Sequence, residues 1–110
     1  MSGITTHVLD TSRGRPAAGV PVVLEIRSNE GWREVARAET DADGRVRNLL
    51  PEVAVGVYRL TFAIETYFEA EGTVGFYPEA SIAFHVRNAG EHHHVPLLVS
   101  PYGYSTYRGS

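Results

Sequence analysis

Cysteine is absent from the 110-residue sequence, which excludes disulfides, zinc–thiolate sites and thiol catalysis. Long apolar runs are absent too, so no segment reaches the length that spans a bilayer. Residues 1–7 have neither the charged start nor the apolar stretch of a signal peptide. We therefore expect a soluble, cytoplasmic protein that does not enter a membrane.

A surplus of positive charge is also missing. The 10 basic and 13 acidic residues give a net charge of −3, and no basic stripe runs along the chain, so nucleic acid is not an expected partner. The composition is typical of a folded protein, with 43% hydrophobic and 21% charged residues. The length predicts one domain spanning residues 1–110.

Turn signals recur at short intervals, and β-branched and aromatic residues fill the segments between them. This rhythm is typical of an all-β sandwich or barrel. Eight strands are predicted, over residues 6–10, 20–27, 32–39, 45–49, 57–65, 80–86, 92–99 and 104–108. In the second of them the even positions from Val20 to Ile26 are apolar, so these side chains share one face.

One short helix is predicted over residues 66–72. Thr66 can cap its first turn, Glu69 follows three residues later as a capping-box partner, and Gly72 can end it. We expect no second helix, because the remaining segments have the patterns of strands and turns.

Titratable side chains concentrate at His7 in the first predicted strand, at Arg45 after a turn, and at the triplet His92-His93-His94 of a late strand. The two-residue period of a strand places His92 and His94 on one face and His93 on the other. Histidine is the side chain most easily poised as a general acid or base near neutral pH. Two imidazoles near a guanidinium therefore suit hydrolysis of a ring amide.

Plain structural interpretations exist for the same residues. Histidine spacing alone is weakly specific, so the triplet also fits a solvated or core-packed cluster. A histidine pair on a strand can bind zinc or copper, but only His7 could add a third ligand, and only if the fold brings it close. Arg45 could simply start an exposed strand, and the C-terminal run could be an edge strand. We expect neither a metal nor a cofactor.

Several motifs occur in a fixed order along nearly the whole chain. They are Thr6-His7-Val8-Leu9-Asp10-Thr11-Ser12, Gly19-Val20-Pro21-Val22, Thr40-Asp41-Ala42-Asp43-Gly44-Arg45, Phe76-Tyr77-Pro78-Glu79, His92-His93-His94-Val95-Pro96-Leu97-Leu98-Val99-Ser100-Pro101-Tyr102 and Tyr107-Arg108-Gly109-Ser110. In this order the chain resembles the transthyretin-like 5-hydroxyisourate hydrolases, and the terminal tetrad is the most specific motif. The family's late triplet is usually His-Tyr-His, so His93 is a departure, at a position that faces away from His94.

The resemblance implies hydrolysis of 5-hydroxyisourate to 2-oxo-4-hydroxy-4-carboxy-5-ureidoimidazoline in urate degradation. It implies a sandwich of two four-stranded sheets with one short helix, assembled as a homotetramer, a dimer of dimers whose central channel holds the sites. Water would be activated by His7 and His94, with Arg45 and Arg108 stabilising the oxyanion. The implied catalytic residues are His7, Arg45 and His94, and the implied substrate-binding residues are Tyr107, Arg108, Gly109 and Ser110.

Two other classes of function remain open. A transthyretin-type carrier would bind a small aromatic ligand in the same channel without turnover. Transthyretin typically has Lys, Glu and Thr where this chain has His7, Arg45 and Tyr107, and it lacks the terminal tetrad. A structural spacer module is the third class, but such modules are normally embedded in long chains with linkers. The sequence therefore favours the enzyme.

Overall fold

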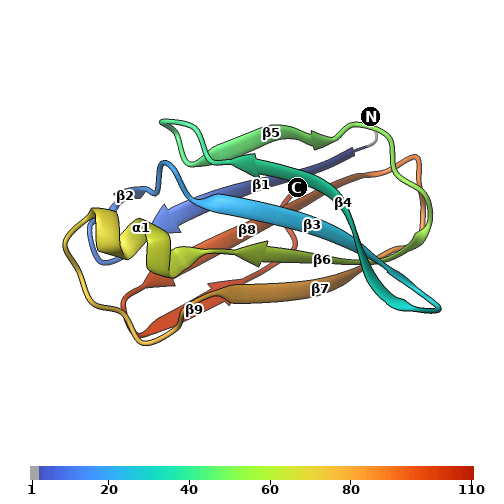
Figure 1. The fold of residues 1–110 in the computed structure, drawn as a ribbon. Helices are drawn as coiled ribbons and strands as arrows, with labels where there is room; N and C mark the ends of the chain where they lie inside the picture. Colours follow the sequence, from blue (N-terminus) through green and yellow to red (C-terminus); the bar gives the residue numbers. More distant parts are fainter. Residues whose placement is uncertain (1–2) are drawn as a thin grey trace.

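The computed structural model describes residues 3–110, which form two packed layers of strands with one short helix at one end (Figure 1). The strands are β1 (Gly3–Asp10), β2 (Arg15–Pro16), β3 (Pro21–Ser28), β4 (Gly31–Glu39), β5 (Arg45–Leu50), β6 (Gly56–Phe62), β7 (Ala80–Val86), β8 (His92–Ser100) and β9 (Gly103–Thr106). The helix is α1 (Ile64–Ala70).

Strand β1 lies inside the first sheet. It pairs with β8 in parallel on one edge and with β5 and the two-residue β2 in antiparallel on the other. Strand β9 pairs with the far edge of β8. The four main strands of this sheet are therefore β5, β1, β8 and β9, with β2 extending the edge that β5 leaves free.

The second sheet has the order β4-β3-β6-β7, and all of its pairs are antiparallel. Helix α1 follows β6 and leads toward β7 across one end of the molecule (Figure 1). The prediction of an all-β, transthyretin-like sandwich of two four-stranded sheets with one short helix is confirmed. The sequence did not predict β2, because Arg15 and Pro16 lie within a turn signal.

Alternation of side chains builds the core between the sheets. In β1, Ile4 and Val8 point inward and are fully buried, and Leu97 of β8 lies opposite Val8 on the neighbouring strand. The second sheet contributes Val22 and Leu24, which are buried as the apolar alternation of that strand predicts. These inward rows leave the opposite face of the first sheet free for polar side chains.

The predicted start of the helix was wrong. Helix α1 begins at Ile64, not at Thr66, and its N-cap residue Ala63 makes no side-chain capping hydrogen bond. Ile64, Tyr67 and Phe68 are the buried residues of the helix, and their i, i+3, i+4 spacing directs one apolar stripe into the core. Burial of Ile64 therefore outweighs the cap signal at Thr66. The backbone N–H of Glu65 donates to the carbonyl of Pro78 at 3.2 Å, which replaces a cap.

The last strand ends earlier than predicted. Strand β9 stops at Thr106, whereas the sequence predicted a strand to Arg108. The next position opposite on β8 is Pro96, which has no backbone N–H to donate to a longer β9. The Thr106 hydroxyl donates to the carbonyl of Pro96 at 2.6 Å instead, so the ladder ends there.

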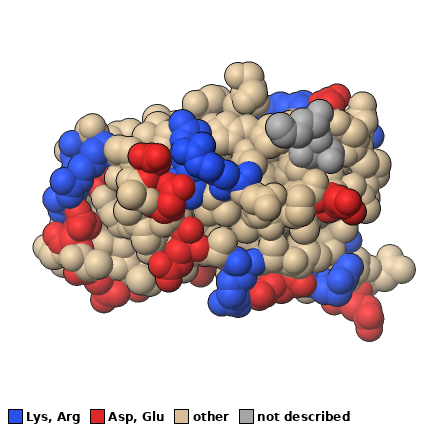
Figure 2. All heavy atoms as spheres, turned by 90° about the horizontal axis from the view of Figure 1, so that it is seen from above, with Lys and Arg blue, Asp and Glu red and all other residues tan. Residues whose placement is uncertain are grey.

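Charged residues of both signs are interspersed on the face seen from above in Figure 2, in keeping with the small net charge. Within residues 3–110, no helix is long and apolar enough to cross a bilayer.

Candidate active site

Parallel pairing of β1 with β8 brings histidines from opposite ends of the sequence onto one face. In this register Thr5 lies opposite His94, and His7 lies opposite Pro96. The rings of His92 and His94 are stacked, with centroids 6.4 Å apart, which confirms that they share a face. His93 points the other way, as predicted, and is only 5% exposed. We refer to the face that carries His7, His92 and His94 as the outer face of the first sheet.

The turn before β5 has a defined geometry. The Asp41 carboxylate accepts hydrogen bonds from the backbone N–H groups of Asp43 at 2.8 Å and Arg45 at 3.0 Å. The bond from Arg45 is the largest of the causes that lower the pKa of Asp41. Gly44 has a φ of +74°, and a Cβ there would collide with the carbonyl oxygen of Val8. Only glycine fits this position, so the Asp-Gly-Arg motif fixes where β5 starts.

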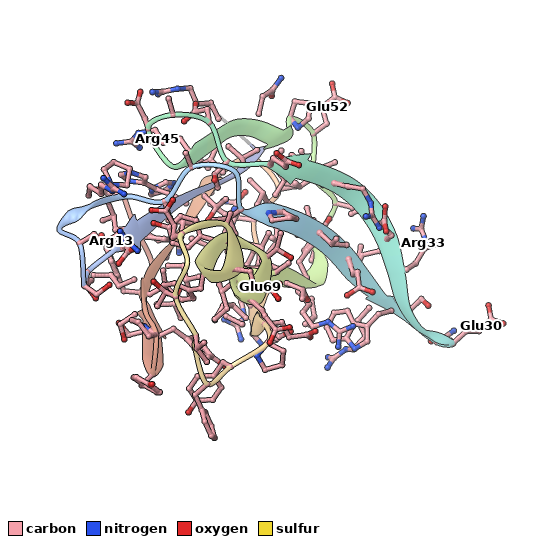
Figure 3. The ribbon with its side chains drawn as sticks, turned by 60° about the vertical axis from the view of Figure 1, so that its left-hand side comes forward. Arg13, Glu30, Arg33, Arg45, Glu52 and Glu69 are labelled. Carbon is pink, nitrogen blue, oxygen red and sulfur yellow. The ribbon has the colours of Figure 1, made fainter. Side chains whose placement is uncertain are left out.

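Arg45 begins β5 directly beside the histidines. It lies opposite His7 in the β1–β5 pairing. Its side chain projects outward, on the other side of the molecule from the β3–β4 hairpin tip that carries Glu30 (Figure 3). Arg47 has Asp43 at 3.4 Å, whereas Arg45 has no carboxylate partner among residues 3–110. The charge of Arg45 is therefore available to a ligand.

His7 is held by its contact with the same turn. Its Nε2 donates to the backbone carbonyl of Asp43 at 2.9 Å. A carbonyl oxygen can only accept, so the hydrogen is on Nε2 and the Nδ1 of the neutral ring is bare. His7 therefore keeps one ring nitrogen that can accept a proton.

An open hollow of about 260 Å³ lies on the outer face of the first sheet. Its polar walls come from Thr5, Arg45, Arg47, His92, His94 and Ser110. These residues belong to β1, β5, β8 and the end of the chain, so the hollow exists only in the folded sheet. A hollow of this size with converging imidazole and guanidinium groups can hold a small polar ring.

His94 is kept neutral near pH 7. Burial lowers the pKa of His94 below the ordinary value of 6.5, and repulsion from the charge of Arg45, and from His7 and His92 when they are protonated, lowers it further. A neutral imidazole beside an unpaired guanidinium can take part in proton transfer or donate a hydrogen bond to a developing oxyanion.

The C-terminal segment returns to His94 after β9 ends. The backbone N–H of Gly109 donates to the carbonyl of His94 at 2.9 Å, as an isolated antiparallel bridge. A Cβ on residue 109 would lie 2.5 Å from Cδ2 of His94, so only glycine allows the chain to pass this close. This contact places Ser110 at the wall of the hollow.

Tyr107 and Arg108 lie on the other side of His94. Both line a neighbouring hollow of about 350 Å³, which His94 also borders. The Arg108 guanidinium donates to the Glu91 carboxylate at 2.6 Å. The structure thus brings His7, Arg45, His94 and Ser110 together, whereas Tyr107 and Arg108 face away from the hollow that Arg45 lines.

Sequence reasoning missed Thr5 and Arg47. The Thr5 hydroxyl lies 2.9 Å from Nε2 of His92 and 2.8 Å from Nδ1 of His94. Strand parity relative to His7 could have placed Thr5 on the outer face, but not opposite His94. Residues 3–110 contain no group of three or more His, Cys, Asp or Glu side chains that could hold a metal ion.

Comparison with known proteins gives consistent matches over the whole chain. A relative from Caulobacter vibrioides, named 5-hydroxyisourate hydrolase, is 53% identical over 115 residues, covering 100% of this chain and 100% of the relative. The structure of transthyretin from Sparus aurata has a TM-score of 0.93 at 30% identity and covers 99% of this chain and 97% of that one.

The structure of Klebsiella pneumoniae 5-hydroxyisourate hydrolase has a TM-score of 0.88 at 36% identity, covering 99% of this chain and 100% of that one. The sequence model of the HIUase/Transthyretin family matches residues 4–109. On the strength of that match and of the identity to its relatives, the chain belongs to the HIUase/Transthyretin family.

Proposed function

We propose that this chain is a 5-hydroxyisourate hydrolase that needs no cofactor. Its product would be 2-oxo-4-hydroxy-4-carboxy-5-ureidoimidazoline, an intermediate of urate degradation. The observation that carries the proposal is the gathering of His7, Arg45 and His94 on one face, beside a hollow that Arg45 and His94 line. The identity to relatives named for this activity supports the choice of substrate.

The reaction needs one water molecule and two proton transfers. The water oxygen bonds to the ring acyl carbon, and the carbon–nitrogen bond of the ring breaks. One imidazole of the pair His7 and His94 takes the proton of the water, and the departing nitrogen receives a proton in turn. The sum is the addition of water, with the enzyme unchanged.

Arg45 and Arg108 differ in whether their charge is already paired with a carboxylate. Arg45 has no carboxylate partner among the described residues and lines the hollow, so it can stabilise an oxyanion directly. Arg108 is paired with Glu91 and would have to release this carboxylate before it binds the substrate. Tyr107 would shape the floor of the neighbouring hollow that His94 also borders, and Gly109 and Ser110 would complete the wall beside His94.

A homotetramer, as a dimer of dimers around a channel, is part of the proposal. Several large apolar side chains are exposed in the single chain, including Phe76 at 69% and Tyr102 at 74%. Exposed aromatic side chains of this kind are typical of surfaces that become covered on assembly. We further propose that residues 1–110 act as one hydrolase domain. The cytoplasmic location stays a prediction.

A carrier is the second candidate, and one observation favours it. The fold is as close to a transthyretin structure as to a hydrolase structure, with TM-scores of 0.93 and 0.88. Similarity of fold therefore does not distinguish an enzyme from a carrier. The side chains on this face distinguish the two functions, because Arg45 at the hollow and His7 opposite it on β1 supply oxyanion and acid–base chemistry that a carrier does not need.

An ultraviolet assay tests the proposal. Urate oxidase generates 5-hydroxyisourate in the cuvette, and the protein is added while the absorbance of the intermediate is followed. We expect decay far faster than the spontaneous rate, and no acceleration by the His94→Asn variant. Spontaneous decay with folded wild-type protein would refute the hydrolase and favour the carrier, which ligand-binding calorimetry would then test.

A further inference from the structure

We propose that Thr5 is a positioning residue for His94, because its hydroxyl joins His94 to His92 and so decides which ring nitrogen of His94 carries the hydrogen. The inference rests on the proposed function and deepens it by assigning different parts to His7 and His94. Thr5 belongs to none of the sequence motifs, and His92 belongs to the histidine triplet but is not among the implied site residues.

The geometry places one hydroxyl between two imidazoles. Thr5 lies directly opposite His94 in the parallel register of β1 and β8. Its Oγ1 is 2.8 Å from Nδ1 of His94 and 2.9 Å from Nε2 of His92, and the two rings are inclined by only 17°. Both contacts have the length of good hydrogen bonds.

A hydroxyl has one hydrogen, which couples the two rings. Thr5 can donate to only one of the two nitrogens. Its oxygen could accept from both, but its own hydrogen would then have no acceptor among residues 3–110, so we infer that it donates to one nitrogen and accepts from the other. If His94 carries its hydrogen on Nδ1, Thr5 donates to His92, whose hydrogen is then also on Nδ1. If Thr5 donates to His94, both neutral rings carry their hydrogens on Nε2. The two histidines therefore share one tautomer.

The surroundings of His92 select between these two states. Nδ1 of His92 is buried and has no hydrogen-bond partner among residues 3–110. A hydrogen on that nitrogen would be a buried donor without an acceptor, which native structures rarely contain. The shared tautomer is therefore the one with both hydrogens on Nε2. His94 then presents an N–H at its remaining nitrogen, on the ring edge opposite Thr5.

This tautomer gives His7 and His94 different roles in the proposed reaction. His94 donates a hydrogen bond to the developing oxyanion as a neutral imidazole, next to the Arg45 guanidinium. The bare Nδ1 of His7, whose Nε2 donates to Asp43, is left to accept the proton of the water. Burial and the charge of Arg45 keep the pKa of His94 low, which suits a neutral donor.

The first test records the tautomers directly. Long-range ¹H–¹⁵N spectra of the wild-type protein near pH 8 distinguish protonated from bare ring nitrogens, and the His92→Gln and His94→Asn variants assign the signals. We expect His92 and His94 both to carry the hydrogen on Nε2. Different tautomers in the two rings, or a bare Nε2 in His94, would overturn the inference whether or not the protein is a hydrolase.

The second test removes the hydroxyl but keeps the shape of the side chain. Loss of a group that orients a histidine costs roughly 10- to 100-fold in metal sites, and we expect a fall of about tenfold or more in kcat for Thr5→Val. KM should change by less than about threefold, because the hydroxyl is engaged by His92 and His94 and acts on turnover through His94. The His94 signals should show a mixture of tautomers.

Thr5→Ser and Thr61→Val are the matched variants. Thr5→Ser keeps the hydroxyl and should restore kcat to within about threefold of the wild type. Thr61→Val makes the same change on β6, where the hydroxyl contacts Ser81 at 3.1 Å, and should leave kcat unchanged. Wild-type kcat in Thr5→Val, or no rescue by Thr5→Ser, would overturn the positioning role. An inactive wild type would refute the proposed function instead, and if Thr5→Val does not fold, the wild-type spectra decide.

Discussion

Arg45 and Arg47 stand two residues apart on β5, yet only one brings an unpaired charge to the hollow. Arg47 lies 3.4 Å from Asp43 and 3.8 Å from Asp41. The backbone N–H of Arg45 is bound by Asp41, whereas its guanidinium has no carboxylate partner within residues 3–110. At the scale of single residues, the site depends on which charges are left without a counterion.

Replacement of Arg45 tests this difference. Arg45→Ala should lower kcat/KM by about 100-fold or more, because a fixed donor to the oxyanion is lost. Arg37→Ala is the matched control, since Arg37 is exposed on β4 and paired with Glu34 at 2.7 Å. It should keep wild-type activity. Equal activity of the two variants in the ultraviolet assay would remove Arg45 from the site.

The titration of His94 gives a second prediction at this scale. Burial is the largest cause of its lowered pKa, and the charge of Arg45 is the second. The imidazole should therefore titrate below pH 6.5 in the wild type, and at a higher pH in Arg45→Ala. A series of ¹H–¹³C spectra between pH 4 and pH 8 measures both values. An identical titration in the two proteins would mean that the guanidinium does not face the ring.

Helix α1 is tied to β1 through a buried hydrogen bond. The Tyr67 hydroxyl donates to the Asp10 carboxylate at 2.7 Å, and Asp10 is fully buried. Burial alone would raise the pKa of Asp10, but hydrogen bonds from Ser12, Tyr67 and the backbone of Arg13 outweigh it and hold the pKa below 3.8. Burial and this bond raise the pKa of Tyr67 to about 12. The pair thus joins helix α1 to the first sheet.

Tyr67→Phe should lower the free energy of unfolding by about 2 kcal/mol at pH 7, the usual contribution of a buried hydrogen bond to a charged group. The carboxylate has a lowered folded pKa, so its contribution is present above pH 3.8 and is lost as the pH falls below that value. The difference in the free energy of unfolding between Tyr67→Phe and the wild type should therefore be smaller at pH 3 than at pH 7. Urea unfolding at pH 7 and pH 3 measures it.

Tyr58→Phe is the control for this pair, because the hydroxyl of the buried Tyr58 donates to the backbone carbonyl of Ala54 at 2.8 Å, a group that does not titrate. Its loss of stability relative to the wild type should be the same at both pH values. A difference between Tyr67→Phe and the wild type that does not depend on pH would mean that Asp10 is not the partner that matters.

Sequence patterns predicted the elements better than their ends. Strand period placed His92, His93 and His94 on their faces, because parity is a local property of the chain. The start of α1 was missed because burial of Ile64 is a tertiary effect. The end of β9 depends on Pro96, ten residues before Thr106 and on another strand. Boundaries set by such neighbours cannot be found from local signals alone.

At the scale of the whole molecule, the parallel register of β1 and β8 determines which side chains meet at the site. This register could not be predicted from the sequence. The sequence contains Thr5 and His94, but their contact joins positions 89 residues apart. Nothing local indicates which residue of β1 faces which residue of β8. The family resemblance implied His7, Arg45 and His94 as site residues, whereas Thr5 emerged only from the three-dimensional pairing.

Removal of residues 107–110 separates the site from the scaffold. These residues follow the end of β9 and dock through the bridge between Gly109 and His94 and the ion pair between Arg108 and Glu91, so both sheets remain intact without them. The truncated protein should lose its activity and keep the sedimentation coefficient of the wild-type assembly, which we expect to be a tetramer. A truncated protein that sediments as a monomer would instead make the segment part of the interface.

The β1–β8 pairing also determines when a working enzyme can exist during folding. Loop closure between segments this far apart is slow compared with hairpin formation, so β3–β4 and β6–β7 can form before β1 finds β8. In a chain emerging from the ribosome, most of the second sheet could form before His7 on β1 and His94 on β8 come together. Activity should therefore appear in refolding only with the last kinetic phase, later than the bulk of the β-structure.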